Sequence, residues 1–175
     1  MNPLLERPAV RRVRDALARA GSGAEVIVLG ETARSAADAA ASLGVALGAI
    51  VKSLVFTVGV EPVMALISGD RRCDPKALAA ALGLDGKVGR ADADVVREAT
   101  GYTIGGVPPF AHARPLPTAI DAGLARFDVV YAAAGHPHCV FGTTVDELAR
   151  LTGAPVVEGI GVAATGSGGG SLRGD

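Results

Sequence analysis

One lysine in an otherwise apolar segment is the first candidate for chemistry. Residues 50–58, IVKSLVFTV, have the composition of a buried strand. Successive side chains of a strand point to opposite faces, so Lys52 shares its face with Leu54 and Phe56, and Ser53 lies on the other. A buried ammonium group is costly, and burial lowers its pKa. Lys52 therefore either extends its charge to solvent beyond the strand or serves a functional site.

A glycine-rich loop is the second candidate. Gly101, Gly105 and Gly106 precede Pro108 and Pro109 in the segment GYTIGGVPP. Glycines let a backbone approach a ligand closely, prolines then fix the shape of the loop, and its amides could hold an oxyanion or a phosphate. An ordinary tight connection is the alternative. Neither of the common nucleotide-binding glycine patterns occurs in the chain.

Two histidines and a thiol form the third candidate. The run GHPHC at 135–139 places His136, His138 and Cys139 close together. They could bind a metal or contact a substrate, or a histidine could simply be hydrogen-bonded within its loop. Zinc would need further ligands, and only Cys73, His112 and scattered carboxylates are available, so we expect no metal and no other cofactor. The serine-hydrolase pattern G-x-S-x-G is absent.

The elements that must position these residues alternate between helices and strands. The apolar runs 50–58 and 63–67 are separated by a turn signal, which predicts a hairpin and hence a mixed sheet. Capping patterns and helical spacing predict helices at 8–20, 36–43, 75–82, 93–99 and 145–151. Further strands are expected at 24–29, 118–121, 129–133 and 139–141. Asp121, near the end of a strand, could orient a polar group or cap the following turn.

The chain length indicates one domain, which we place at residues 1–160. A chain of 175 residues can bury a core without disulfides, and the Gly/Ser-rich tail at 161–175 is expected to be disordered. The two cysteines are far apart and fit a reducing cytoplasm. No run approaches the ~20 apolar residues of a membrane helix, and the first residues lack the apolar core of a signal peptide, so we expect a cytoplasmic protein without a membrane partner.

Charge and aromatic content argue against general nucleic-acid binding. The formal net charge is -1, and the chain has no Trp, two Tyr and four Phe. Such a protein has neither bulk attraction to phosphate nor rows of aromatic platforms for bases. Any contact with a nucleic acid must be local, for example through Arg11, Arg12 and Arg14 or through Arg71 and Arg72.

Four segments together resemble one known family. They read ARSAADAAASLGVALGAIVKSLVF, LISGDRRCDPKALAAALG, ATGYTIGGVPPF and TAIDAGLARFDVVYAAAG, in that order, and span about residues 30–153. In this combination they resemble the aminoacyl-tRNA deacylases named for YbaK and the prolyl-tRNA synthetase editing domain. The resemblance implies an α/β (α+β) fold with a mixed, partly rolled sheet flanked by helices. It also implies one pocket that hydrolyses mischarged aminoacyl-tRNA in trans.

The resemblance also assigns roles to residues. The family's essential lysine falls on Lys52, its glycine loop on Gly101, Gly105 and Gly106, and its last pocket glycine on Gly135. A desolvated ammonium and backbone amides can stabilise an oxyanion and place the terminal adenosine, so no protein nucleophile is required. Water or a group of the substrate, such as the ribose hydroxyl, could attack.

Two departures from the family pattern affect specificity. The family loop commonly reads S-P-x-G after its glycine pair, whereas Pro108 to His112 replace the serine and the last glycine here. The GHPHC run also differs from better-known members, which makes His136 and His138 specificity candidates. Ser53, Gly135 and His136 are expected to contact the aminoacyl group. The edited amino acid, dimerisation and the need for a synthetase partner stay open. So do two other functions: a module that binds aminoacyl-tRNA 3′ ends or acyl-nucleotides without hydrolysis, and a metal-dependent hydrolase.

Overall fold

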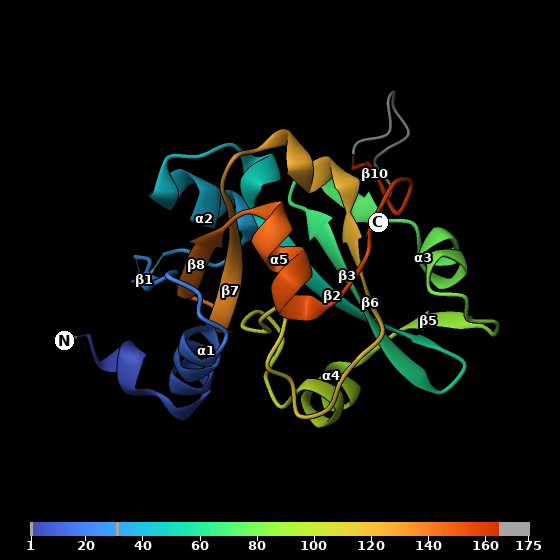
Figure 1. The fold of residues 1–175 in the computed structure, drawn as a ribbon, viewed down its shortest axis with the longest axis horizontal. Coiled ribbons are helices and arrows are strands. Elements are labelled where there is room, and N and C mark those ends of the chain that lie inside the picture. Colours follow the sequence, from blue (N-terminus) through green and yellow to red (C-terminus); the bar gives the residue numbers. More distant parts are fainter. Residues whose placement is uncertain (1, 31, 165–175) are drawn as a thin grey trace.

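The computed structural model describes residues 2–30 and 32–164, which form three small sheets flanked by helices (Figure 1). The α-helices are α1 (Pro8–Arg19), α2 (Ala36–Leu43), α3 (Pro75–Ala81), α4 (Ala93–Thr100) and α5 (Val145–Thr152). The longer strands are β2 (Val51–Val58), β3 (Glu61–Ser68), β6 (Thr118–Asp121), β7 (Val130–His136) and β8 (Cys139–Thr143). The shorter ones are β1 (Val26–Val28), β4 (Arg71–Cys73), β5 (Val88–Arg90), β9 (Val156–Val157) and β10 (Gly161–Ala163). Three 3-10 turns complete the described chain: η1 (Pro3–Glu6), η2 (Leu47–Ala49) and η3 (Ala122–Arg126).

The largest sheet is mixed and has the strand order β5-β2-β3-β6-β9. Its hairpin of β2 and β3 is antiparallel, whereas β6 runs parallel to β3 and β9 parallel to β6. A second sheet has the order β1-β8-β7, and a third pairs β10 with β4. One isolated parallel bridge, between Ile50 and Tyr131, joins the start of β2 to β7. The mixed α/β architecture expected from the sequence is therefore confirmed.

Helices cover both faces of the β2-β3 hairpin. On one face, α1, α4 and α5 contribute Val13, Val96 and Leu148 to the main core, together with Val51 and Val55 of β2. On the other face, residues of α3 pack with Phe56 and Ile67, and Figure 1 shows α3 on the far side of the hairpin from α1. Because alternate side chains of β2 enter the two cores, Lys52 and Ser53 face different surroundings.

Each helix begins where local chemistry predicts it. Pro8 opens α1, and the side chains of Ser35, Asp74, Asp92 and Thr144 accept hydrogen bonds from backbone amides at the starts of α2, α3, α4 and α5. These bonds satisfy amides that otherwise have no partner within the helix. None of the described helices is both long and apolar enough to cross a membrane.

Several strands differ from the sequence prediction. β7 extends to His136, past the predicted end at residue 133, with a register irregularity between Ala133 and His136. β4, β5 and β9 were not predicted at all. β10 pairs with β4, so regular structure extends three residues beyond the domain end predicted at 160. The rest of the predicted tail, from residue 165 on, lies outside the described residues.

Candidate active site

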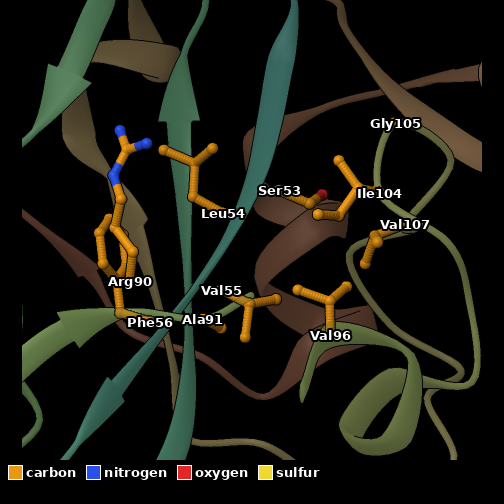
Figure 2. A pocket seen from close by; sticks show the side chains of 10 residues that line it. All are labelled: Ser53, Leu54, Val55, Phe56, Arg90, Ala91, Val96, Ile104, Gly105 and Val107. Atoms are coloured by element: carbon orange, nitrogen blue, oxygen red, sulfur yellow. The ribbon is translucent and has the colours of Figure 1, made fainter. Parts of the chain in front are cut away.

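A cavity of about 210 Å³ lies between β2 and the loop that follows α4. One water molecule needs only ~10–15 Å³ on the same kind of measure, so the space is large enough for part of an organic ligand. Its walls are mostly aliphatic, and Figure 2 shows side chains of β2, α4 and the loop on opposite sides of it. It is lined by Ser53, Leu54, Val55, Phe56, Arg90, Ala91, Val96, Ile104, Gly105 and Val107.

The cavity lies at a gap in the strand pairing of β2. On this edge, β5 pairs with β2 from Phe56 to Val58, and the isolated bridge to β7 involves Ile50. The Val55 carbonyl accepts a hydrogen bond from Ala91 N at 3.4 Å, so it points to this edge. Backbone groups alternate between the two edges with a period of two residues, so the N–H and C=O of Ser53 also point there. The cavity therefore meets both a side chain and polar backbone groups at Ser53.

Ser53 also contributes an unpaired hydroxyl. Its Oγ is the one buried side-chain oxygen or nitrogen without a hydrogen-bond partner among the described residues. Buried hydroxyls usually find a partner, because an unpaired one costs about 1–3 kcal/mol. The hydroxyl lines the cavity beside the glycine loop, where a ligand or a water can bind it (Figure 2).

The glycine loop packs against the GHPH turn, residues 135–138. The amide of Gly135 donates a hydrogen bond to the Gly106 carbonyl at 2.9 Å. A Cβ added at Gly106 would lie 2.8 Å from His136 N, and one at Gly105 would lie 3.4 Å from Pro137 Cγ. Only glycine allows this approach at 106, so the backbone of the loop packs directly on the turn. Gly101 lies elsewhere: it caps α4 with φ +85° and does not line the cavity.

The two histidines lie on the GHPH turn, outside the cavity lining. The ring nitrogen Nδ1 of His136 accepts a hydrogen bond from His138 N at 3.0 Å, and the rings pack edge to face at 5.2 Å. Burial lowers the pKa of His136, and the charges of Arg7 and His138 lower it further. Neither ring lines the cavity. No group of three or more His, Cys, Asp or Glu side chains within residues 2–30 and 32–164 is arranged to hold a metal.

Lys52 extends from the opposite face of β2 and does not line the cavity. Its Nζ donates a hydrogen bond to the carbonyl of Arg71 in β4. Burial lowers the pKa of Lys52, while the negative charges of the Asp70 and Asp121 carboxylates oppose that effect. Leu54 shares the face of Lys52 and lines the cavity, so the cavity includes residues from both faces of β2.

A buried carboxylate, that of Asp121, lies close enough to Lys52 to affect its pKa. Asp121 is 1% exposed and accepts hydrogen bonds from Ser68 N at 3.1 Å and from Gly123 N at 2.8 Å. Its Oδ1 also lies 3.4 Å from a guanidinium nitrogen of Arg71. Asp121 therefore performs both roles considered from the sequence, because it caps η3 and orients a polar group. A Cβ at Gly161 would lie 2.2 Å from its carboxylate, so β10 closes over this cluster.

Among the lining residues that the sequence analysis did not propose are Arg90 and Ile104. Arg90 lies on β5, a three-residue strand that contains a glycine and has a weak strand signal. Ile104 lies next to the glycine pair and is 60% exposed. An exposed large aliphatic residue in a glycine-rich loop is a signal that could have identified Ile104.

Comparisons with known proteins identify related chains. The sequence profile of the aminoacyl-tRNA editing domain matches residues 30–151, which include β2, the glycine loop and the GHPH turn. The protein YwhH of Bacillus subtilis strain 168, whose function is uncharacterised, is 32% identical over 116 residues, covering 66% of this chain and 73% of YwhH.

Solved structures share the fold over most of their length. A crystal structure described provisionally as a trans-editing enzyme for prolyl tRNA synthetase superposes with a TM-score of 0.81 at 41% identity. The superposition covers 86% of this chain and 96% of that one. The hypothetical protein APE2540 superposes with a TM-score of 0.78 at 29% identity, covering 86% of this chain and 99% of that one.

Proposed function

The chain belongs to the aminoacyl-tRNA editing domain family, and on that basis we propose that it deacylates mischarged aminoacyl-tRNA in trans. The observation that carries the proposal is the cavity at the β2 edge. It combines aliphatic walls, the unpaired Ser53 hydroxyl and a glycine loop, which suits a small acyl group held beside polar anchors. The relative described for prolyl tRNA synthetase suggests tRNAPro as the first substrate to test.

In the proposed reaction the ester carbonyl of the aminoacyl group lies between Ser53 and the loop. Water adds to the carbonyl carbon, the tetrahedral intermediate breaks its bond to the ribose oxygen, and that oxygen takes the proton. The products are the free amino acid and the tRNA with its terminal hydroxyl. The polar groups at Ser53 and the amide of Gly105 contact the acyl group and the developing oxyanion, while the Gly106 amide donates to the Thr103 carbonyl at 3.0 Å and holds the loop in shape. His136 and His138 affect amino-acid specificity through the turn against which the glycine loop packs.

Lys52 supplies positive charge in this proposal. Its ammonium gives up the hydrogen bond to the Arg71 carbonyl and binds the ester carbonyl or the terminal phosphate of the substrate instead. To do so, the Lys52 side chain moves past Leu54, which lies on the same face of β2 and lines the cavity. No metal takes part in this mechanism. The ammonium holds charge and position, since the mechanism assigns no protein nucleophile.

The test is deacylation of a panel of correctly and incorrectly charged tRNAs by the purified chain. We expect release of the amino acid from at least one mischarged tRNA and loss of that activity in Lys52→Ala. Lys76→Ala, which removes an exposed lysine charge from α3, is the matched control and should keep the activity. If every charged tRNA of the panel stays intact after incubation with the wild-type protein, the proposed deacylase function is refuted.

A second candidate is a module that binds the aminoacylated 3′ end without hydrolysing it. The observation that favours it is the engagement of the Lys52 ammonium with Arg71 rather than with the cavity. Tight binding of a non-hydrolysable aminoacyl-adenosine analogue, with no hydrolysis of the natural ester, would establish this function in place of the first.

A further inference from the structure

The cavity at the β2 edge has one charged side chain in its lining, that of Arg90. β5 runs antiparallel to β2 and places Arg90 opposite Phe56. Directly opposed residues of an antiparallel pair have their Cβ atoms about 4.5–5.5 Å apart, so the Arg90 stem lies beside the ring of Phe56. Figure 2 shows the guanidinium group extending beyond this ring, beside Leu54.

The guanidinium group of Arg90 is available to a ligand. Arg90 is exposed, and the four ion pairs found in the described part of the chain do not include it. The nearest acid that follows it in sequence, Asp92, uses its side chain to accept a hydrogen bond from Val95 N at 2.9 Å. A guanidinium without a carboxylate partner, at the edge of an apolar cavity, is suited to bidentate binding of a phosphate.

The two polar side chains of the lining differ in kind. Ser53 offers a buried neutral hydroxyl, and Arg90 offers an exposed cation, while the lining between them is aliphatic or aromatic. A matching ligand carries a small acyl group at one end and an anion at the other. An aminoacylated nucleotide has this arrangement, because a phosphodiester follows its terminal nucleoside.

We propose that Arg90 binds the phosphodiester group next to the terminal nucleoside of the substrate while the acyl group occupies the cavity at Ser53. The inference rests on the proposed editing function and adds to it a residue that selects a nucleic-acid end over a free aminoacyl ester. It also gives a chain with a net charge of -1 a local contact with a tRNA phosphate.

The experiment compares two substrates that differ in phosphate. One is the mischarged tRNA, and the other is the same amino acid esterified to adenosine, which has no phosphate. Arg90→Ala should raise KM for the tRNA about tenfold or more with kcat changed less than threefold, because a charge-assisted hydrogen bond to phosphate is lost. The same variant should hydrolyse aminoacyl-adenosine as the wild type does. Arg90→Lys should recover part of the loss.

Arg97→Ala is the matched control, because Arg97 is also exposed, lies on α4 next to the lining residue Val96, and does not line the cavity. It should leave both KM values unchanged. Three results overturn the inference: an unchanged KM in Arg90→Ala, an equal loss on both substrates, or an equal loss in Arg97→Ala.

Failure of the editing function is distinguishable from failure of this inference. If the wild type hydrolyses neither substrate, binding is measured with a tRNA minihelix and an adenosine that carry the amino acid through a non-hydrolysable amide. Arg90→Ala should then weaken binding of the minihelix about tenfold and leave binding of the adenosine unchanged. Equal binding of the minihelix by wild type and variant refutes the role of Arg90.

Discussion

Replacing Ser53 by alanine should separate stability from activity. The Ser53 hydroxyl is buried without a partner, so its removal takes away an unsatisfied polar group and little packing. Because an unpaired buried hydroxyl costs about 1–3 kcal/mol, the free energy of unfolding of Ser53→Ala should stay the same or rise by up to about 1 kcal/mol. In the proposed site the hydroxyl binds the substrate, so activity should change in the opposite direction.

The expected loss of activity follows from one neutral hydrogen bond. Such a bond contributes about 0.5–1.5 kcal/mol, and 1.36 kcal/mol is tenfold in rate, so kcat/KM for the mischarged tRNA should fall roughly 2- to 13-fold. Urea unfolding gives the stability and single-substrate kinetics the activity.

Ser68 offers a matched control. It is fully buried in the neighbouring strand, and its Oγ is hydrogen-bonded to the Gly48 carbonyl and to Asp70. Ser68→Ala should therefore lower the free energy of unfolding by about 1–3 kcal/mol. If Ser53→Ala destabilises the fold as much as Ser68→Ala and deacylates normally, Ser53 is a structural residue and the active site does not lie at this cavity.

Three further outcomes are expected. Asp121→Ala should lower the free energy of unfolding by about 3 kcal/mol, and Tm by roughly 6–12 °C in calorimetry, because Ser68 N loses its acceptor; a fall under 2 °C would contradict this. Gly106→Ala should displace the loop, since its Cβ would lie 2.8 Å from His136 N, and reduce kcat/KM at least tenfold, whereas full activity would show that the loop is not part of the site. Burial lowers the pKa of Lys52 from 10.5, so in the alkaline range the unfolded chain holds this proton after the folded protein has released it. Because of that difference, the free energy of unfolding gains a positive slope against pH up to about pH 10.5. Lys52→Met should show a smaller slope in this range. Identical slopes for the variant and the wild type would contradict the burial of the charge.

Local signals explain why much of the fold was predictable. The caps at Ser35, Asp74, Asp92 and Thr144 act within three residues of the chain, so their sequence patterns locate the starts of four helices. The hairpin of β2 and β3 depends on a short turn between two apolar runs, which is equally local.

Pairing between distant segments explains what was not predictable. β4 consists of Arg71, Arg72 and Cys73, and its partner β10 lies about ninety residues later in the chain. Neither segment has the apolar alternation that predicts a strand. Each is held in place by pairing with the other, and β10 packs against Asp121. The hydrogen bond from Lys52 to the Arg71 carbonyl was also not predictable, because every residue has a backbone carbonyl and the sequence does not indicate which one accepts.

The candidate site was predictable only in part. Residue types and family resemblance predicted Ser53 and the glycine pair. The structure places Ser53 and Gly105 on one cavity, whereas Gly106 packs against the backbone of His136 and does not line the cavity. Strand alternation also indicated that Lys52 and Ser53 face different sides, but not that the cavity includes residues from both faces of β2. That arrangement results from the gap between β5 and β7, which depends on the pairing of three separate strands.

The proposed function is hydrolysis of the ester bond of a mischarged aminoacyl-tRNA. The most direct measurement is the time course of labelled amino acid released from mischarged tRNAPro and from a wider panel, with the wild-type protein and with no protein. We expect faster release than the spontaneous rate for at least one mischarged tRNA, while the correctly charged tRNA keeps its amino acid. Release at the spontaneous rate across the whole panel would contradict the proposed function.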